Sequence, residues 1–387
     1  MAAAPPAHRA QFEADLRSAA ADTARGVVTA RARSTCNLWQ IWTSYCVDVG
    51  ADPFLLAYDD PIPLLQVYAL RYRLGTLSAS GRPVKKRQVE EALRAIGQTL
   101  SGLGFPDPRF PSTGGGKLEF RLRRQLAGYQ RADPAPSRVK PIPIAVLQFA
   151  AATAASQNTP FSLTLVDMLI LAFFFLLRPG EYVSSSSADA APFRFANVHL
   201  FCGNRKLHLE RASDQELWSA TFVGLEFTNQ KNCVKGEIIG LGRSGSDLWC
   251  PVRASIRRII ALRRHHAPPH TPLHSYWDGH RWCCIASTHL TAILRTAILV
   301  MGDQHGLQPS DVTARSLRTS GAMALLCANV DTDRIRLIGR WRSDEMFRYL
   351  HTQAAPLTKD IALRMLTHGS FVLIPNTPHA ALVQALM

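Results

Sequence analysis

The chain has 387 residues, of which 47% are hydrophobic and 19% are charged, a composition typical of a folded globular protein rather than a disordered one. This length is enough for two ordinary domains, each with its own core. Lysine and arginine outnumber aspartate and glutamate by 44 to 29, a formal net charge of +15, and so large an excess indicates a polyanionic partner, usually nucleic acid. Ribosomal and membrane-surface proteins share this balance, so charge alone does not identify the partner.

The sequence shows no pattern of a membrane span or a secretion signal. Its longest apolar run, residues 168–177, lies between Asp167 and Arg178 and is too short to cross a bilayer. The eight cysteines are scattered without a CxxC pair, which indicates free thiols in a reducing compartment. We therefore expect a nuclear protein if the host is eukaryotic and a cytoplasmic one otherwise, with no membrane partner and no small-molecule substrate.

The first third of the chain predicts a small helical domain. Residues 1–27 are rich in alanine and polar residues and are expected to form a loose N-terminal arm. Within residues 28–131 apolar residues recur with the period of a helix, and no strand pattern occurs. The predicted helices lie near 34–49, 61–70, 89–100 and 117–131. Residues 132–143 contain four prolines, which prevent a regular helix and mark an extended basic linker.

Residues 144–387 predict a second domain in which helices dominate. Strand patterns occur at 198–209, 218–227 and 237–241, with a turn around residues 230–235. The predicted helices lie at 143–157, 162–178, 251–265, 288–301, 316–328, 332–339, 344–352 and 358–367. The predicted fold class is therefore mainly α with a small β-sheet (α+β).

The second domain contains a residue pattern suited to phosphate chemistry. Arg315 and Arg318 are three residues apart, so we expect both on one face of a helix turn. A guanidinium stays charged at physiological pH and matches two phosphate oxygens at once. Trp341 and Tyr349 follow downstream, and nearby cations favour the phenolate form of a tyrosine, which is its nucleophilic form. The pattern predicts a phosphate clamp with a tyrosine nucleophile.

Two sets of residues give this pattern a wider context. The first is Leu176-Leu177-Arg178-Pro179-Gly180-Glu181, and the second is Arg315–Arg318 together with Gly339-Arg340-Trp341 and Tyr349. In order and spacing they resemble the two boxes of the tyrosine recombinase (phage integrase-like) family, and are most similar to recombinases of crypton and DIRS-like eukaryotic mobile elements. The stretch 228–232 lies where that family keeps a lysine. The resemblance covers roughly residues 140–360. It implies a helical core-binding domain followed by an integrase-like catalytic domain that extends into a C-terminal tail.

The resemblance implies a site-specific recombinase or integrase that cuts and rejoins DNA through a 3′-phosphotyrosyl intermediate, without metal or cofactor. The catalytic residues that it implies are Arg178, Lys231, Arg315, Arg318, Trp341 and Tyr349. Lys231 would protonate the leaving oxygen as general acid, with Lys235 as the alternative. Arg340 is the alternative to Trp341, and Glu181 would orient an arginine.

One position departs from the family pattern, because histidine usually stands where this chain has Arg315. Arginine cannot act as a base at neutral pH, so removal of the Tyr349 proton has no obvious catalyst. Two other functions therefore stay open, a DNA-binding protein of recombinase fold that does not cut, and an enzyme similar to type IB topoisomerases.

The expected partner is double-stranded DNA, bound by a homo-multimer. The predicted DNA-binding residues are Lys85, Lys86, Arg87, Arg138 and Lys140. The first three precede a predicted helix, and they could instead form a nuclear import signal or a solvated surface. Histidines and cysteines between residues 265 and 284 match no common zinc spacing, so we expect no metal.

Overall fold

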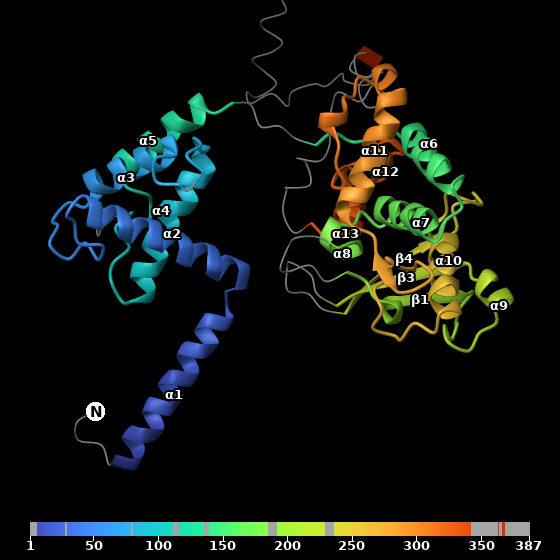
Figure 1. Ribbon diagram of the computed structural model, residues 1–387, viewed down its shortest axis with the longest axis horizontal. Helices are drawn as coiled ribbons and strands as arrows, with labels where there is room; N and C mark the ends of the chain where they lie inside the picture. Colours follow the sequence, from blue (N-terminus) through green and yellow to red (C-terminus); the bar gives the residue numbers. More distant parts are fainter. Residues whose placement is uncertain are drawn as a thin grey trace, which may run out of the picture. The chain divides into compact units, whose positions relative to one another are not determined.

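The computed structural model describes residues 6–27, 29–78, 80–110, 116–134, 139–184, 192–228, 236–341, 363 and 366–367. The chain divides into two compact units (Figure 1), residues 1–137 with 187–189, and residues 138–186 with 190–387. Among the helices described, none combines the length and apolarity that a membrane crossing requires.

The described part of the first unit is helical. It consists of α1 (Pro6–Arg25), α2 (Thr29–Asp48), α3 (Ile62–Leu74), α4 (Lys86–Gly102) and α5 (Phe120–Ala132). Aromatic residues form the centre of its core, where the ring of Trp42 meets the ring of Tyr68 edge-on, with centroids 5.1 Å apart. Leu93 and Ile96 of α4 and Leu122 of α5 are fully buried around them. Burial of these apolar faces explains why α2 to α5 fold together.

The N-terminal segment differs from the loose arm that we expected, because residues 6–25 form helix α1. Its alanines favour a helix by intrinsic propensity. Side-chain contacts four residues apart add support, since Gln11 donates to Asp15 over 2.9 Å and Arg17 lies 4.0 Å from Glu13. We predicted a loose arm because these residues show no apolar stripe. A helix that forms by local propensity does not require such a stripe, so the prediction failed.

The second unit is built around helix α7 (Pro160–Phe174), which is buried along most of its length. Helices α6 (Ile144–Ala155), α10 (Pro251–Arg264) and α12 (Ser316–Cys327) pack against it (Figure 1). A helix that is apolar on every side has to be covered in this way. The remaining helical elements are α8 (Pro179–Tyr182), η1 (Phe195–Asn197), α9 (Asp214–Trp218), α11 (Ser287–Met301), η2 (Asp303–His305), η3 (Pro309–Asp311) and α13 (Thr332–Gly339).

The second unit also contains a small antiparallel sheet in the order β2-β1-β3-β4. The strands are β1 (Val198–Cys202), β2 (Arg205–Lys206), β3 (Phe222–Phe227) and β4 (Glu237–Gly242). The predicted single strand 198–209 is a hairpin, because the chain reverses at Gly203, whose φ is 57°. A separate hairpin, β5 (Ser275–Trp277) with β6 (Trp282–Cys284), lies between predicted helices, where we had predicted no strand. The predicted class, mainly helical with a small sheet, is confirmed.

A buried polar network connects α7, α10 and β5. Arg258 of α10 is 2% exposed and donates to the hydroxyl of Thr164 and to the carbonyl oxygens of Leu273 and Ser275. Asp167 of α7 pairs with Arg257 over 2.6 Å. These two arginines of α10 therefore hold the fold together.

His274, which precedes β5, predicts a pH dependence of stability. It is 1% exposed, and its Nε2 lies 2.9 Å from the hydroxyl of Ser184. Burial, followed by the charge of Arg258, lowers the pKa of His274 from 6.5 to about 4. Between pH 6.5 and 4, His274 is therefore protonated in the unfolded chain and neutral in the folded chain. We expect the free energy of unfolding to fall by about 2 kcal/mol between pH 7.5 and pH 5.

Urea unfolding of the wild-type chain and of His274→Gln at the two pH values measures this effect. The variant should lose about 2 kcal/mol less than the wild type over the same interval. The matched control is His270→Gln, because His270 is exposed and should leave the wild-type pH dependence unchanged. Identical pH dependences of the wild type and His274→Gln would contradict the assignment.

Candidate functional site

The first part of the site is the turn that ends the buried helix α7. The helix ends at Phe174, four residues before the end that we predicted, because Leu176 takes a left-handed conformation with φ of 51°. Arg178 then becomes the N-cap of α8 and Pro179 its first residue, the position in a helix that proline favours. The turn brings Arg178 out of the core, so that its side chain is 34% exposed.

The second part of the site is Arg318, which reaches this turn from α12. It is 3% exposed and donates from Nη1 to the carbonyl oxygen of Leu176 and from Nη2 to that of Gly339. Its guanidinium also lies 4.1 Å from the ring centroid of Trp341, within the range of a cation–π contact. Arg318 thus ties the end of α7 to the end of α13.

Close packing of α12 on α7 requires a residue without a side chain. A Cβ at Gly321 would collide with the backbone oxygen of Phe173 and with the side chain of Leu176. Glycine costs stability inside a helix, and here it allows α12 to approach α7 closely enough for Arg318 to reach the turn. Gly321 was the available sequence signal for this contact, and we did not use it.

The third part of the site is an ion pair between Glu181 of α8 and Arg340. Arg340 ends α13 in a left-handed conformation, with φ of 57° and ψ of 41°. Its side chain is 1% exposed, and its Nη2 lies 2.9 Å from Oε2 of Glu181. Burial lowers the pKa of Arg340, and the charge of Glu181 opposes that shift. A buried guanidinium needs such a carboxylate, because an unpaired charge in the interior is very costly.

The same carboxylate also holds Arg178. Glu181 accepts the backbone N–H of Arg178 at 2.7 Å through Oε2 and its Nη1 at 2.9 Å through Oε1. One acidic side chain therefore lies between an arginine that is partly open to solvent and one that is buried. Figure 1 shows α8 and α13 together in the second unit, as these contacts require.

The structure brings together some of the sequence-predicted residues and separates others. Arg178, Arg318 and Trp341 lie around the turn at Leu176. Arg315 is exposed, whereas Arg318 is buried, so these two arginines do not form the exposed pair on one helix face that we expected. The reason is that Arg315 is the N-cap of α12 and precedes its first turn. Arg340 and Trp341, which we left as alternatives, both contact the site.

Lys231, Tyr349 and Arg138 lie outside the described residues. The strand ends on either side of residues 229–235 are described, and Gly236 donates to the carbonyl oxygen of Phe227 over 2.9 Å. The guanidinium of Arg340 lies 3.9 Å from the ring centroid of Phe227. The described strand ends on either side of residues 229–235 therefore lie near Arg340.

The predicted DNA-binding cations are largely paired. Lys86 lies 2.7 Å from Glu90 and Arg87 lies 3.2 Å from Glu91, while Lys85 is the exposed N-cap of α4. Lys140, in the second unit, pairs with Asp311 over 2.8 Å. Surface pairs of this kind contribute little stability, so a polyanion can displace the acidic partners at small cost.

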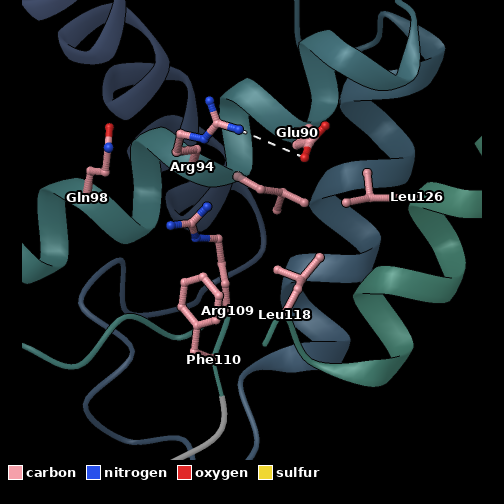
Figure 2. Close-up of a pocket in the computed structure, with 8 residues that line it drawn as sticks. Glu90, Arg94, Gln98, Arg109, Phe110, Leu118 and Leu126 are labelled. Carbon is pink, nitrogen blue, oxygen red and sulfur yellow. Dashed lines mark ion pairs between the residues drawn. The ribbon is translucent and has the colours of Figure 1, made fainter. Parts of the chain in front are cut away.

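The first unit contains a pocket of about 300 Å³ beside α4. Figure 2 shows Arg94 and Arg109 together in it, with Glu90, Phe110 and Leu118 around them. Arg94 lies 3.9 Å from Glu90, and Arg109 lies 2.6 Å from Asp107. Each of these two arginines therefore has an acidic neighbour.

No family model matches the chain, and no curated protein matches it. The solved structures to which it is similar include three recombinases. The Tn1549 transposon integrase in complex with transposon right end DNA is 11% identical with a TM-score of 0.44, over 79% of this chain and 84% of that one. XerA recombinase is 14% identical with a TM-score of 0.34, over 87% and 100%. XerH site-specific recombinase bound to difH substrate is 11% identical with a TM-score of 0.36, over 80% and 96%. Similarities of this size do not establish a common family or activity.

Proposed function

We propose that this chain is a site-specific DNA recombinase that cuts and rejoins strands through a phosphotyrosyl intermediate at Tyr349. The observation that carries the proposal is the convergence of two distant stretches. Arg318, from the stretch around 313–319, bonds to the turn from which Arg178 projects. These are the two stretches whose order and spacing resemble tyrosine recombinases, and their meeting in space is independent of that resemblance.

In the proposed reaction the Tyr349 oxygen attacks a backbone phosphorus, and the bond from phosphorus to the 5′-oxygen breaks. The 5′-oxygen takes a proton from Lys231, and the free hydroxyl later attacks a phosphotyrosyl bond on a partner strand. Negative charge grows on the non-bridging oxygens during attack, and preorganised cations at such oxygens are usually the largest contribution to catalysis. Because the number of phosphoester bonds is conserved, the reaction needs no metal and no cofactor.

The geometry suggests different roles for the arginines. Arg178 is partly exposed and Arg315 is exposed, so these two are available to a phosphate. Arg318 donates to two backbone carbonyls. It therefore holds the turn from which Arg178 projects, and its positive charge adds to the potential at the phosphate without direct contact. Trp341 packs against Arg318 and fixes that guanidinium in place.

The proposed partner is double-stranded DNA, bound by several copies of the chain. The net charge of +15 supports a polyanionic partner. The proposed source is a mobile element of crypton or DIRS type, on the resemblance that the two arginine stretches carry. Under this proposal the first unit is the core-binding domain, residues 132–143 are the linker and the second unit is the catalytic domain, in the nucleus if the host is eukaryotic.

Arg315 favours a second candidate, a DNA-binding protein of the same fold that does not cut. A guanidinium at this position cannot remove the proton of Tyr349. A relaxing enzyme similar to type IB topoisomerases, acting as a monomer, is the third candidate.

A trapping assay on nicked duplex DNA tests the proposal. The DNA would be taken from the sequences that flank the gene, searched for terminal or split direct repeats. The wild-type chain should form a covalent adduct that survives denaturing gel electrophoresis. Tyr349→Phe should abolish the adduct and leave DNA binding intact, because only the nucleophilic oxygen is removed. Tyr58→Phe is the matched control, since Tyr58 is exposed in the first unit, and it should retain the adduct.

The other candidates give different results in the same assay. Absence of an adduct with wild-type chain on every flanking sequence, together with retained binding, would favour the protein that does not cut. Relaxation of any supercoiled plasmid by a monomer, without strand exchange, would favour the topoisomerase-like enzyme.

A further inference from the structure

The hairpin β5–β6 has a rigid tip that the proposed reaction does not use. Its strands pair Trp277 with Trp282. In the turn, the carboxylate of Asp278 accepts the backbone N–H groups of His280 and Arg281 at 2.8 and 2.9 Å. Gly279 takes φ of 108°, which only glycine adopts readily. A tip held in this way loses little conformational freedom when something binds to it.

Three aromatic rings gather at the base of this tip. The ring of His265, which follows α10, stacks on Trp277 with centroids 5.5 Å apart and planes 20° apart. Trp282 meets both rings edge-on, at 6.0 Å from His265 and 5.6 Å from Trp277. The two tryptophans are half-buried, and His265 is exposed. His265 is therefore the solvent-exposed ring of the stacked pair, and Trp282 packs edge-on against both rings. We refer to these three residues as the aromatic platform.

Positive charge flanks the aromatic platform. Arg264 is exposed and has no ion-pair partner in the part of the chain that the structure describes. The Arg281 side chain is 81% exposed, and its Nε lies 3.7 Å from Asp278, a contact too long to hold it firmly. Two exposed guanidiniums thus adjoin the aromatic platform in sequence, Arg264 before His265 and Arg281 before Trp282.

Hydrogen bonds join the hairpin to the segment that follows α8. The backbone N–H of Ser184 donates to Ile285 over 3.1 Å, and that of Ser287 donates to Ser184 over 3.2 Å. The hairpin itself packs near the start of α7, because Arg258 donates to the hydroxyl of Thr164 and to the carbonyl oxygen of Ser275. From Thr164 to the end of α7 the helix rises about 15 Å, so the aromatic platform lies several nucleotides along a strand from a phosphate bound at Arg178.

We propose that the aromatic platform stacks an unpaired nucleobase of the DNA whose phosphate lies in the candidate site. A base displaced from the duplex extends the column of His265 and Trp277 by one ring, and Arg264 and Arg281 contact the phosphates on either side of it. Every base has a π-face, so this binding tolerates any sequence. The proposal rests on the proposed function for its choice of nucleic acid, but its readout does not depend on cleavage.

The same stretch does not form a metal site in the described structure. It contains His265, His266, His270, His280, Cys283 and Cys284, but no three His, Cys, Asp or Glu side chains among the described residues lie close enough to hold an ion. Cys283 instead lies 3.2 Å from the carboxylate of Asp278, within the turn that keeps the tip rigid.

Binding measurements with two DNA probes test the proposal. Fluorescence anisotropy would compare a labelled oligodeoxythymidylate of about 15 nucleotides with a duplex of the same length. His265→Ala and Trp282→Ala should each weaken binding of the single strand by roughly 5- to 150-fold, and binding of the duplex by less than twofold. Trp218→Ala is the control, because Trp218 is a surface tryptophan of α9, and it should change neither. Since His265 is exposed, its replacement should leave the melting temperature unchanged.

An oligonucleotide with abasic sites separates stacking from charge. It keeps the phosphates and lacks the bases, so wild-type chain should bind it as weakly as His265→Ala binds the intact strand. Equal binding of the abasic and intact strands by wild-type chain would overturn the proposal. So would equal losses of single-strand and duplex binding in the variants, or a change in self-association without any change in DNA binding, which would mark a protein interface. If an adduct forms at Tyr349 and any of these results is obtained, the proposed function is retained and the stacking proposal is rejected.

Discussion

Replacement of Arg178 by alanine is expected to lower the rate of covalent adduct formation by roughly 100- to 1,000-fold, the usual effect of removing one donor from a developing oxyanion. Arg178 is the arginine of the candidate site that is partly exposed and also fixed, because Glu181 holds both its guanidinium and its backbone N–H. Single-turnover cleavage of a nicked duplex measures the rate.

Arg315→Ala is the matched control for this prediction. Arg315 is exposed, and its side chain has no ion-pair partner among the described residues, so it is less preorganised. We expect a smaller loss of rate than for Arg178→Ala, and a weaker salt dependence of DNA binding, since one phosphate contact is removed. Equal rates for the two variants would show that Arg178 is not the principal cation at the phosphate.

Removal of the Glu181 carboxylate should be the most destabilising single change at the site. Glu181→Ala leaves Arg340 charged and 1% exposed without its acidic partner, and breaking a buried pair in this way costs about 3–5 kcal/mol. It also frees the guanidinium of Arg178. Urea unfolding measures the first effect, and the cleavage rate of the fraction that remains folded measures the second.

A double variant distinguishes loss of the pair from loss of packing. Glu181→Leu together with Arg340→Met replaces both charges by apolar groups of similar volume, which is often neutral or stabilising. The double variant should regain most of the stability lost in Glu181→Ala. It should not regain cleavage, because Arg178 still lacks its carboxylate. A double variant no more stable than Glu181→Ala would refute the role of the buried charge.

Periodicity in the sequence was sufficient for the helices that bury one face. The predicted helix 332–339 has the bounds of α13, and the helices predicted at 251–265 and 316–328 differ from α10 and α12 by one residue. Within the predicted helix 34–49, Trp42 and Tyr45 belong to the apolar residues that recur with the helical period, and both are buried. Helix α1 was missed because it has no such stripe, and β5–β6 because its strands are three residues long and follow several prolines.

The candidate site could be predicted only as a set of residue types. Spacing suggested that Arg178, Arg318 and the stretch 339–341 act together, and contacts at Leu176 and Gly339 now join them. Spacing could not show that Arg318 would donate to backbone carbonyls while Arg315 stayed exposed. This difference depends on the residue at which α12 begins. Nor could it show that Glu181 pairs with Arg340, 159 residues away, since tertiary packing alone brings α8 against α13.

The left-handed residue that ends α13 has a geometric consequence for the remainder of the chain. Arg340 is anchored to Glu181 and to the turn after α7, so the backbone that continues toward Tyr349 starts from a point that cannot drift relative to Arg178. An extended chain of nine residues spans at most roughly 30 Å. A phosphate that Tyr349 attacks must therefore lie within that distance of Arg340, whichever path the intervening residues take.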